Sequence, residues 1–502
     1  MGGNKESQEV SFQDLQVESG RNNLSNEALL EVAGIFYNGV QFDSIRLDGL
    51  IQKVGDDPFP VEIQNALKIL SESIANFTAP AEEIVQKTSC NLNELLTINS
   101  WIQESKLCRL TSNSNYFPGY LAAGYAKDFY KDLATNPNYF KNVVAGNPVA
   151  PKRLEIHSTN ANCNYKCEMC LWRVKGEGKY ALSDNHLLVG DEWIEVLKDA
   201  KRLGTETVIF SGGGEPLLRK DNAEIIKAAI GVGLFTMIYT NGSEISKLKK
   251  NNDELYKTIL NTDWLRVSLH ATTEERYAQL VGIPKESNPL TKVVKGLKDL
   301  ISDRNSMGLP LKLGLGFVIQ NLNHDQVENV VNLANTLGLD FLNLRIDCIN
   351  VTQSLSDEEK NGLYKRLAMI REKLNQGYFG NLKIDFDDRL IALMNGWNEP
   401  SFGSVRECKV HLYRPAINPY GRVGVCDLAA EPFFSRDNLT LGFVGQGKNF
   451  ATVINESAGK SFDGSKCTSC MPGQQVINSL WYKVIKDLSL GIRPEDQALY
   501  FK

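Results

Sequence analysis

The chain has 502 residues, 42% hydrophobic and 23% charged, which is enough for two or three domains with buried cores and argues against disorder. Its formal net charge of -5 argues against a general binder of nucleic acids or of anionic membranes, since both need basic surfaces. It contains no apolar run of transmembrane length and starts with polar and charged residues, so we expect a cytoplasmic protein without a membrane partner.

Residues 1–148 are predicted to form a mostly helical N-terminal domain without a metal-binding motif. Apolar residues recur at helical spacing in the segments 63–74 and 95–102. The order of helices between residues 60 and 110 loosely resembles a winged-helix fold of the kind that docks leader peptides. A packing or dimerisation extension accounts for the same pattern.

Residues 149–385 alternate between short β-branched runs and longer helix-like stretches. The predicted strands cover residues 154–158, 207–211, 235–240, 265–270, 312–319 and 341–346. Such alternation indicates a parallel sheet, because each helix returns the chain to the same end of the next strand. Six consecutive units predict an α/β fold built as a partial (β/α)6 TIM-like barrel, with functional loops at the carboxyl ends of the strands.

The loop after the first predicted strand contains three closely spaced cysteines, Cys163, Cys167 and Cys170. Their spacing lets three thiolates converge on one centre and leaves that centre one protein ligand short. A four-iron cluster held in this way keeps one iron open to a substrate or cofactor. Structural zinc is the alternative, although it prefers four closed ligands, and a disulfide is disfavoured in a reducing compartment.

The second predicted strand is followed by the loop Ser211-Gly-Gly-Gly-Glu-Pro216. Glycines let a backbone approach a ligand closely, and the carboxylate can accept a hydrogen bond from a ligand amine. The two loops together, within about residues 150 to 350, resemble the CxxxCxxC and GGEP loops of the radical S-adenosylmethionine superfamily. The resemblance implies an enzyme that uses S-adenosylmethionine and a 4Fe-4S cluster, reduced by an electron donor such as flavodoxin or ferredoxin.

This resemblance also implies roles for individual residues. Cys163, Cys167 and Cys170 would bind the cluster whose open iron is chelated by S-adenosylmethionine. The remaining family positions near the cofactor's methionine end, carboxylate or ribose, and adenine are occupied by Gly212, Gly213, Gly214, Glu215, Thr240, Asn241, Ser268, Ile319 and Gln320. Strand-end capping is the alternative role for Thr240, Asn241 and Ser268. The family usually has an aromatic residue before its third cysteine, whereas this chain has Met169, whose thioether can also pack on adenine.

Residues 386–502 are predicted to form a small iron-sulfur domain that contains four further cysteines. Cys408 and Cys426 flank a hairpin-like stretch, and Cys467 and Cys470 form a CxxC pair. This layout resembles the SPASM and twitch auxiliary domains of the same superfamily, which implies a second, fully ligated 4Fe-4S cluster. No cysteine follows Cys470, so we expect one auxiliary cluster and not two. Structural zinc is again the alternative.

Cys348 directly follows the sixth predicted strand and is therefore expected at the functional edge of the barrel. A thiol there can donate a hydrogen atom to a carbon radical, and the arrangement resembles that of radical peptide epimerases. The resemblance implies conversion of L- to D-residues in a ribosomally made precursor peptide that carries a leader, with the auxiliary cluster returning an electron to the sulfur.

Other interpretations of these features remain open. Cys348 can be an inert strand-end cysteine. The reaction can instead be a peptide crosslink, or the dehydrogenation of a sugar or aminocyclitol, in which the auxiliary cluster accepts an electron. A non-catalytic iron-sulfur scaffold is the alternative from a different class, although it leaves the loop at residues 211–216 without a purpose.

Overall fold

The chain divides into two compact units, Met1–Pro118 and Gly119–Lys502. A computed structural model describes residues 41–42, 108–109, 136–159, 162–170, 172, 187–347, 355–387, 390, 407–431, 437–445, 447–465, 467, 470 and 472–489. In the first unit the described residues form two short antiparallel strands, β1 (Gln41–Phe42) and β2 (Cys108–Arg109). The helices predicted at 63–74 and 95–102 lie outside the described residues, so the winged-helix interpretation stays a prediction.

The second unit is built on a ten-stranded sheet with a parallel centre. The parallel strands are β3 (Arg153–Ile156), β4 (Thr207–Phe210), β5 (Phe235–Thr240), β6 (Trp264–Ser268), β7 (Lys312–Ile319), β8 (Phe341–Ile346) and β9 (Lys383–Phe386). The prediction of an α/β partial barrel is confirmed, and β3 to β8 correspond to the six predicted strands.

The sheet continues beyond β3 into the C-terminal part of the chain. β10 (Ala416–Ile417) pairs in parallel with β3 and antiparallel with β11 (Arg422–Gly424), and β11 pairs antiparallel with β12 (Thr440–Phe443). The same sheet therefore contains strands from both sides of residue 386, where the C-terminal domain was predicted to begin.

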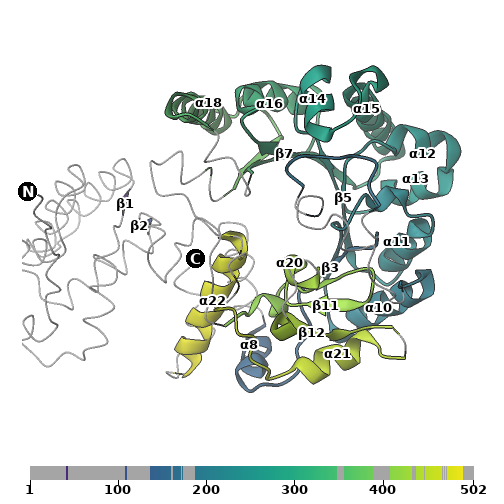
Figure 1. The fold of residues 1–502 in the computed structure, drawn as a ribbon, viewed down its shortest axis with the longest axis vertical. Helices are drawn as coiled ribbons and strands as arrows, with labels where there is room; N and C mark the ends of the chain where they lie inside the picture. Colours follow the sequence, from purple (N-terminus) through teal and green to yellow (C-terminus); the bar gives the residue numbers. More distant parts are fainter. Residues whose placement is uncertain are drawn as a thin grey trace, which may run out of the picture. The chain divides into compact units, whose positions relative to one another are not determined.

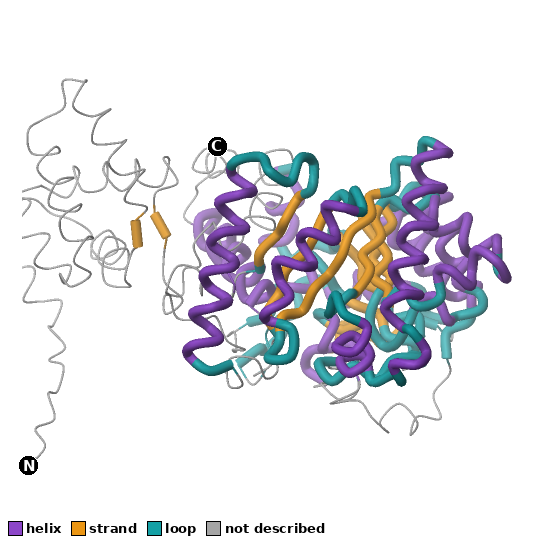
Figure 2. The backbone as a smooth tube through the Cα atoms, turned by 90° about the horizontal axis from the view of Figure 1, so that it is seen from above, coloured by secondary structure: helices purple, strands orange, loops and turns teal. Residues whose placement is uncertain are grey.

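Helices cover the outer side of the sheet, as Figure 1 shows, and Figure 2 shows them packed along the strands. The helices within the barrel are α10 (Gly190–Leu203), α11 (Asn222–Gly231), α12 (Ile245–Asn251), α13 (Asp253–Leu260), α14 (Glu274–Val281), α15 (Pro289–Met307), α16 (Val327–Thr336) and α18 (Asp357–Asn375). Outside it lie α8 (Pro137–Val144), α20 (Asp427–Ala430), α21 (Phe450–Ser457) and α22 (Pro472–Ser489). The short 3-10 turns are η2 (Pro216–Leu218), η3 (Lys285–Ser287), η4 (His324–Gln326), η5 (Val410–Leu412) and η6 (Asp437–Leu439).

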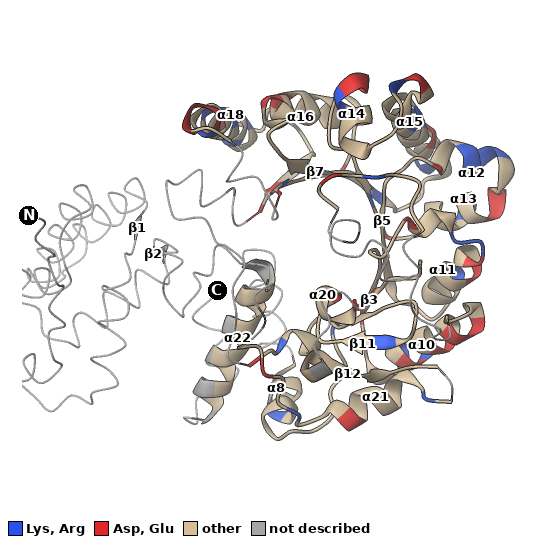
Figure 3. Cartoon of the chain, viewed as in Figure 1, with Lys and Arg blue, Asp and Glu red and all other residues tan. Residues whose placement is uncertain are grey.

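The amphipathic pattern explains why these helices lie against the sheet. In α10 the buried residues include Trp193, Val196, Leu197 and Ala200, the face that the sequence pattern predicts. Charged residues gather on helices such as α10, α12, α15 and α18 (Figure 3). Among the helices of the described residues, none is both long enough and apolar enough to span a bilayer.

An aromatic pair fills the sheet's interior near the ends where its central strands begin. The rings of Trp264 and Phe341 stack with centroids 3.8 Å apart. A Cβ at Gly314, on the strand between them, would lie 2.4 Å from the Phe341 ring, so a glycine is required for this packing. With the strands' beginnings filled, the carboxyl edge is left as the place for a ligand site.

Candidate cofactor site at the carboxyl edge of the sheet

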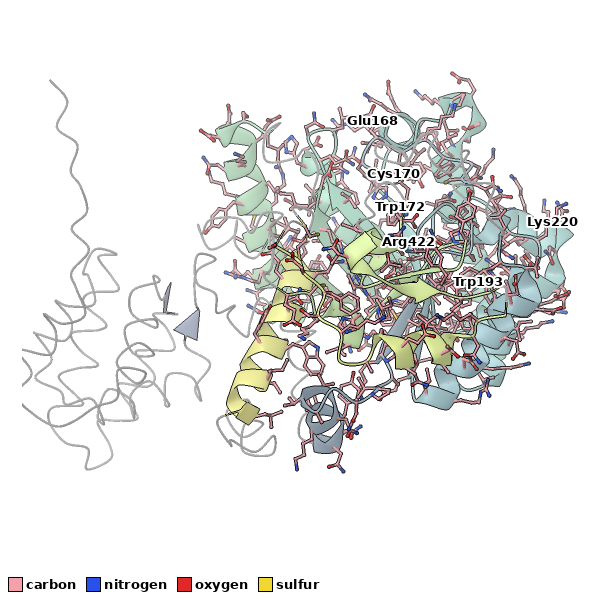
Figure 4. The ribbon with its side chains drawn as sticks, turned by 60° about the horizontal axis from the view of Figure 1, so that its bottom comes forward. Glu168, Cys170, Trp172, Trp193, Lys220 and Arg422 are labelled. Carbon is pink, nitrogen blue, oxygen red and sulfur yellow. The ribbon has the colours of Figure 1, made fainter. Side chains whose placement is uncertain are left out.

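The cysteine loop leaves β3 at the carboxyl edge and is held along α14. Cys163 is exposed, and Cys167 and Cys170 are half-buried. The backbone N–H of Lys166 donates to the Val281 carbonyl at 2.8 Å, which fixes the middle of the loop at the end of that helix. Glu168, Cys170 and Trp172 follow one another inward from the edge of the molecule in Figure 4. Although the residue as a whole is exposed, the surrounding loops desolvate the Cys163 thiol and raise its pKa to about 11, so without a metal it is neutral at pH 7.

The glycine loop after β4 is packed directly on the cysteine loop. Gly212, Gly213 and Gly214 have φ angles of 43°, 66° and 149°, which favour glycine. A Cβ at Gly214 would lie 2.5 Å from the Asn162 carbonyl oxygen, so a side chain is also excluded by contact. The backbone N–H of Glu215 donates to that oxygen at 2.9 Å. The two predicted loops are thus joined backbone to backbone.

The Glu215 carboxylate connects the ends of β4 and β5. It accepts hydrogen bonds from the Thr240 hydroxyl at 2.6 Å, the Asn241 backbone N–H at 2.7 Å and the Leu217 N–H at 3.1 Å. Burial raises its pKa to about 7, against the lowering effect of these bonds. Three of the predicted cofactor residues, Glu215, Thr240 and Asn241, therefore meet here. A ligand amine at this place would bond a carboxylate that already accepts hydrogen bonds from the ends of β4 and β5.

Two asparagines extend this connection to the cysteine loop. The Asn241 amide donates to the Asn164 side-chain oxygen at 2.9 Å and lies 3.8 Å from the Cys163 sulfur. The Asn164 amide in turn donates to the Ser243 hydroxyl at 2.8 Å and to Glu244 at 3.0 Å. Sequence reasoning did not single out Asn164, whose only signal is its place inside the cysteine motif.

The remaining predicted cofactor residues lie at the same edge but are not joined to Glu215 by the bonds above. Ser268 ends β6 and is half-buried, and its carbonyl accepts from the Tyr277 hydroxyl at 3.4 Å. Ile319 ends β7 and is buried. The next residue, Gln320, is 6% exposed, and its amide nitrogen has no hydrogen-bond partner among the residues that the structure describes. Met169 is half-buried within the cysteine loop.

Cys348, the predicted hydrogen donor, lies outside the described residues. The residue before it, Asp347, is buried and its N–H donates to the Ile319 carbonyl at 3.0 Å. The chain therefore reaches the carboxyl edge of the sheet one residue before Cys348, while the position of the thiol stays a prediction.

The four C-terminal cysteines gather near one another and are free thiols. Cys408, Cys426 and Cys470 are buried and Cys467 is half-buried. Burial raises the pKa of Cys408 to about 11, and Cys467 adds to the increase, while Cys408 and Cys470 both raise the pKa of Cys426. Hydrogen bonds hold these segments together, because the Cys408 N–H donates to the Phe462 carbonyl at 2.7 Å and the Lys409 N–H donates to the Asn478 side-chain oxygen at 2.5 Å. The Ala429 N–H donates to the Cys426 sulfur at 3.4 Å, a bond that suits a metal-bound thiolate.

Both sets of thiols fit iron-sulfur chemistry by their donor atoms. Soft thiolate ligands select iron-sulfur clusters and zinc rather than hard cations. Within the described part of the chain, no group of three or more His, Cys, Asp or Glu side chains is placed to hold a metal ion. Sulfurs around a four-iron cluster bind different iron atoms, so they lie farther apart than the ligands of one ion.

A hollow of about 670 Å³ opens beside η4 and α18. It is lined by His324 and by α18 residues that include Glu358, Glu359, Lys365 and Arg366. None of the residues predicted from the sequence as site residues lines it, so it lies apart from the candidate site.

Comparison with known proteins agrees with the loop arrangement. Residues 158–334 match the Radical SAM superfamily. A probable GTP 3',8-cyclase of Saccharolobus islandicus is 29% identical over 201 residues, which are 40% of this chain and 57% of that protein. A probable GTP 3',8-cyclase of Sulfurisphaera tokodaii is 32% identical over 184 residues, 36% of this chain and 52% of that protein. The chain thus spans about half the length of the curated relatives it matches.

Solved structures with a similar course of the chain are more distant. Streptococcus suis SuiB bound to the precursor peptide SuiA covers 80% of this chain and 82% of its own, at 14% identity and a TM-score of 0.44. Native anSMEcpe with bound AdoMet covers 70% of this chain and 100% of its own, at 15% identity and a TM-score of 0.43. At these values the likeness concerns the fold alone.

Proposed function

We propose that this chain, whose residues 158–334 match the Radical SAM superfamily, is a radical S-adenosylmethionine enzyme that epimerises residues in a precursor peptide. The observation that carries the first part is the direct attachment of the glycine loop to the cysteine loop, through the Glu215 N–H and the Asn162 carbonyl. That bond supports the proposal, because it holds the loop proposed to bind the cofactor's amino acid end against the loop proposed to bind the cluster.

The chain's own residues hold and orient the cofactors. Cys163, Cys167 and Cys170 hold the first cluster, and Asn164 with Asn241 fixes the loop that carries them. When bound, the cluster and S-adenosylmethionine supply methionine and a 5'-deoxyadenosyl radical that can remove a hydrogen atom from carbon. Glycine at residues 212–214 keeps side chains out of the backbone surface that the cofactor approaches.

The epimerase proposal rests on Cys348. The Cα–H bond of an L-residue breaks and its hydrogen atom ends in 5'-deoxyadenosine; the Cys348 S–H bond then breaks and its hydrogen joins the opposite face of the same carbon. One electron, supplied through the second cluster, and one proton from solvent restore the thiol. Support comes from the position of Cys348 in the sequence, directly after Asp347, whose N–H is hydrogen-bonded to the end of β7 at the carboxyl edge.

The C-terminal cysteines hold a second cluster in this proposal. Their support is that, besides burial, Cys467 raises the pKa of both Cys408 and Cys470, while Cys408 and Cys470 raise the pKa of Cys426. The substrate is a peptide with a leader, for which the N-terminal unit is the proposed docking part, and the electron donor is a flavodoxin or ferredoxin.

The second candidate function is an oxidation, either a peptide crosslink or the dehydrogenation of a sugar or aminocyclitol. The same four thiols favour it, because a substrate radical that loses an electron needs an acceptor within the protein.

Turnover in heavy water separates the two candidates. Thiol hydrogens exchange with solvent and Cα hydrogens do not, so epimerisation adds about one mass unit to each converted residue. Crosslinking or dehydrogenation instead removes two hydrogens. Cys348→Ala should still cleave S-adenosylmethionine but yield little D-amino acid, whereas normal epimerisation by this variant would overturn the role of Cys348.

A further inference from the structure

His157 is the centre of a buried ionic group that sequence reasoning did not find. It follows β3 directly and is fully buried. Its Nδ1 bonds the Glu431 carboxylate, and its Nε2 lies 3.5 Å from Glu155 Oε1. Glu431 is also fully buried, and Glu155 is 5% exposed. Buried charges of this kind persist only when they are paired, because their desolvation is costly.

The ionic group continues into the C-terminal segment. Glu155 Oε2 lies 3.4 Å from Arg414 Nε, and Arg414 Nη2 lies 4.0 Å from Asp427 Oδ2. Asp427 also accepts a hydrogen bond from the Gln474 amide at 2.5 Å. The network formed by these residues, which we call the buried ionic network, therefore runs from β3 through α20 to the start of α22.

Its two ends lie beside the glycine loop and beside the segment that carries Cys426. On one side a Cβ at Gly212 would lie 2.4 Å from His157 Nε2, and the His157 ring meets the Trp172 ring edge-on with centroids 5.5 Å apart. On the other side Glu431 is the C-cap of α20, whose N-cap is Cys426. One histidine thus contacts the glycine loop and the chain after the cysteine loop, and is paired with the segment that carries a C-terminal cysteine.

The segment from Cys426 to Glu431 is held as a rigid piece. The Ala430 N–H donates to the Cys426 carbonyl at 3.1 Å. A Cβ at Gly424 would lie 2.2 Å from the Ala430 nitrogen, so β11 and α20 are in direct backbone contact. A displacement of Glu431 therefore moves Cys426 with it.

We infer that His157 and Glu431 are positioning residues, which hold the glycine loop and the segment from Cys426 to Glu431 in a fixed arrangement. By this arrangement they maintain the binding of S-adenosylmethionine at the glycine loop, to which Glu431 does not belong. The inference rests on the proposed function in one respect, that the glycine loop binds S-adenosylmethionine.

Electrostatics explains why the pair is sensitive to neutralisation. Burial lowers the pKa of His157, but the Glu431 and Glu155 carboxylates outweigh it and raise the pKa to about 10. The other charged groups of the network are Arg414, which helps to lower the pKa of Glu155 to about 2, and Asp427. Glu431→Gln alone leaves the imidazolium short of a partner, whereas a second change, His157→Gln, removes the surplus charge.

The test compares Glu431→Gln, His157→Gln, the double variant and a control in the reconstituted full chain. The control is Glu254→Gln, the same chemical change in the exposed ion pair with Lys227. Binding of S-adenosylmethionine is measured by equilibrium dialysis, and hydrogen exchange is followed in peptides that cover residues 207–218 and 422–431.

We expect about tenfold weaker binding and faster exchange at residues 207–218 for Glu431→Gln, with the control unchanged. The loss of S-adenosylmethionine affinity in the double variant should be smaller than the product of the losses in the two single variants. If Glu431→Gln does not fold, recovery of folding in the double variant supports the pairing, and failure of both overturns it. Unchanged binding and exchange in a folded Glu431→Gln also overturns the inference. A wild-type chain that does not bind S-adenosylmethionine refutes the proposed function. Hydrogen exchange at residues 207–218 in Glu431→Gln would then still test whether Glu431 holds the glycine loop.

Discussion

The charge on His157 should make the stability of the second unit depend on pH in a way that Glu431→Gln removes. The folded protein holds the pKa of His157 at about 10, above the ordinary value of 6.5. A raised folded pKa gives stability that is complete below pH 6.5 and is lost as the pH rises toward 10. At low pH this contribution amounts to about 5 kcal/mol, at 1.36 kcal/mol for each pKa unit.

The useful window lies between pH 6.5 and 8.5. There the His157 contribution should fall by about 2 kcal/mol. Glu215, with a folded pKa of about 7, and the buried His270 and His411, with lowered pKa values, also contribute near pH 6.5. The contributions of His270 and His411 are the same in wild type and variant, so they cancel in the difference between the two proteins. Glu215 belongs to the loop that Glu431→Gln loosens, so its contribution is removed by making Glu215→Gln in both backgrounds.

The assay is urea unfolding of the reduced, metal-free full chain at both pH values, with hydrogen exchange at residues 153–158 as the local measure. Wild type should lose about 2 kcal/mol more than Glu431→Gln across the window, because the largest raising influence on the His157 pKa is gone. Glu254→Gln should keep the wild-type slope. Equal slopes in wild type and Glu431→Gln would refute the assignment of this charge to the buried pair.

Two other predictions concern the loops at the carboxyl edge. Anaerobically reconstituted protein should contain about eight irons, and replacing Cys163, Cys167 and Cys170 by alanine should remove about half of them, as measured by iron analysis. Retention of all the iron would contradict the division of the ligands into a set of three and a set of four. Gly212→Ala should abolish cleavage of S-adenosylmethionine to 5'-deoxyadenosine, since its Cβ would collide with His157. Gly308→Ala, at a similar positive φ of 62° but with nothing within 4 Å, should lose only about 1 kcal/mol of stability and keep activity.

The main strands could be predicted because their residues are β-branched or apolar and return at regular intervals. The predicted run 207–211, for example, differs from β4 by one residue. The short strands β10 and β11 were described only as part of a hairpin-like stretch, and their attachment to β3 was not foreseen. Strands of two or three residues show too little alternation to reveal a pairing partner.

The cysteine loop and the glycine loop could also be located at the carboxyl edge from the sequence, since their residues are close together in the chain: the cysteines lie within eight residues and the glycines are consecutive. Their binding of a cofactor stays a prediction. The hydrogen-bond partners of Glu215 could not be predicted, because Thr240 and Asn241 come close to it only through the order of the strands in the sheet. The His157–Glu431 pair had no sequence signal at all. Single buried titratable residues look like any other polar residue until the fold brings them together.

The pairing of β10 with β3 also bears on the order of events during synthesis. His157 and Glu431 are 274 residues apart, so the edge of β3 beside the cysteine loop remains unpaired while most of the barrel is translated. An open strand edge is a site for misassociation, and it closes only when the C-terminal segment arrives. Under the proposed function, iron that reaches the cysteine loop before that moment would bind beside an unpaired strand edge. Iron that arrives later would bind beside a paired one.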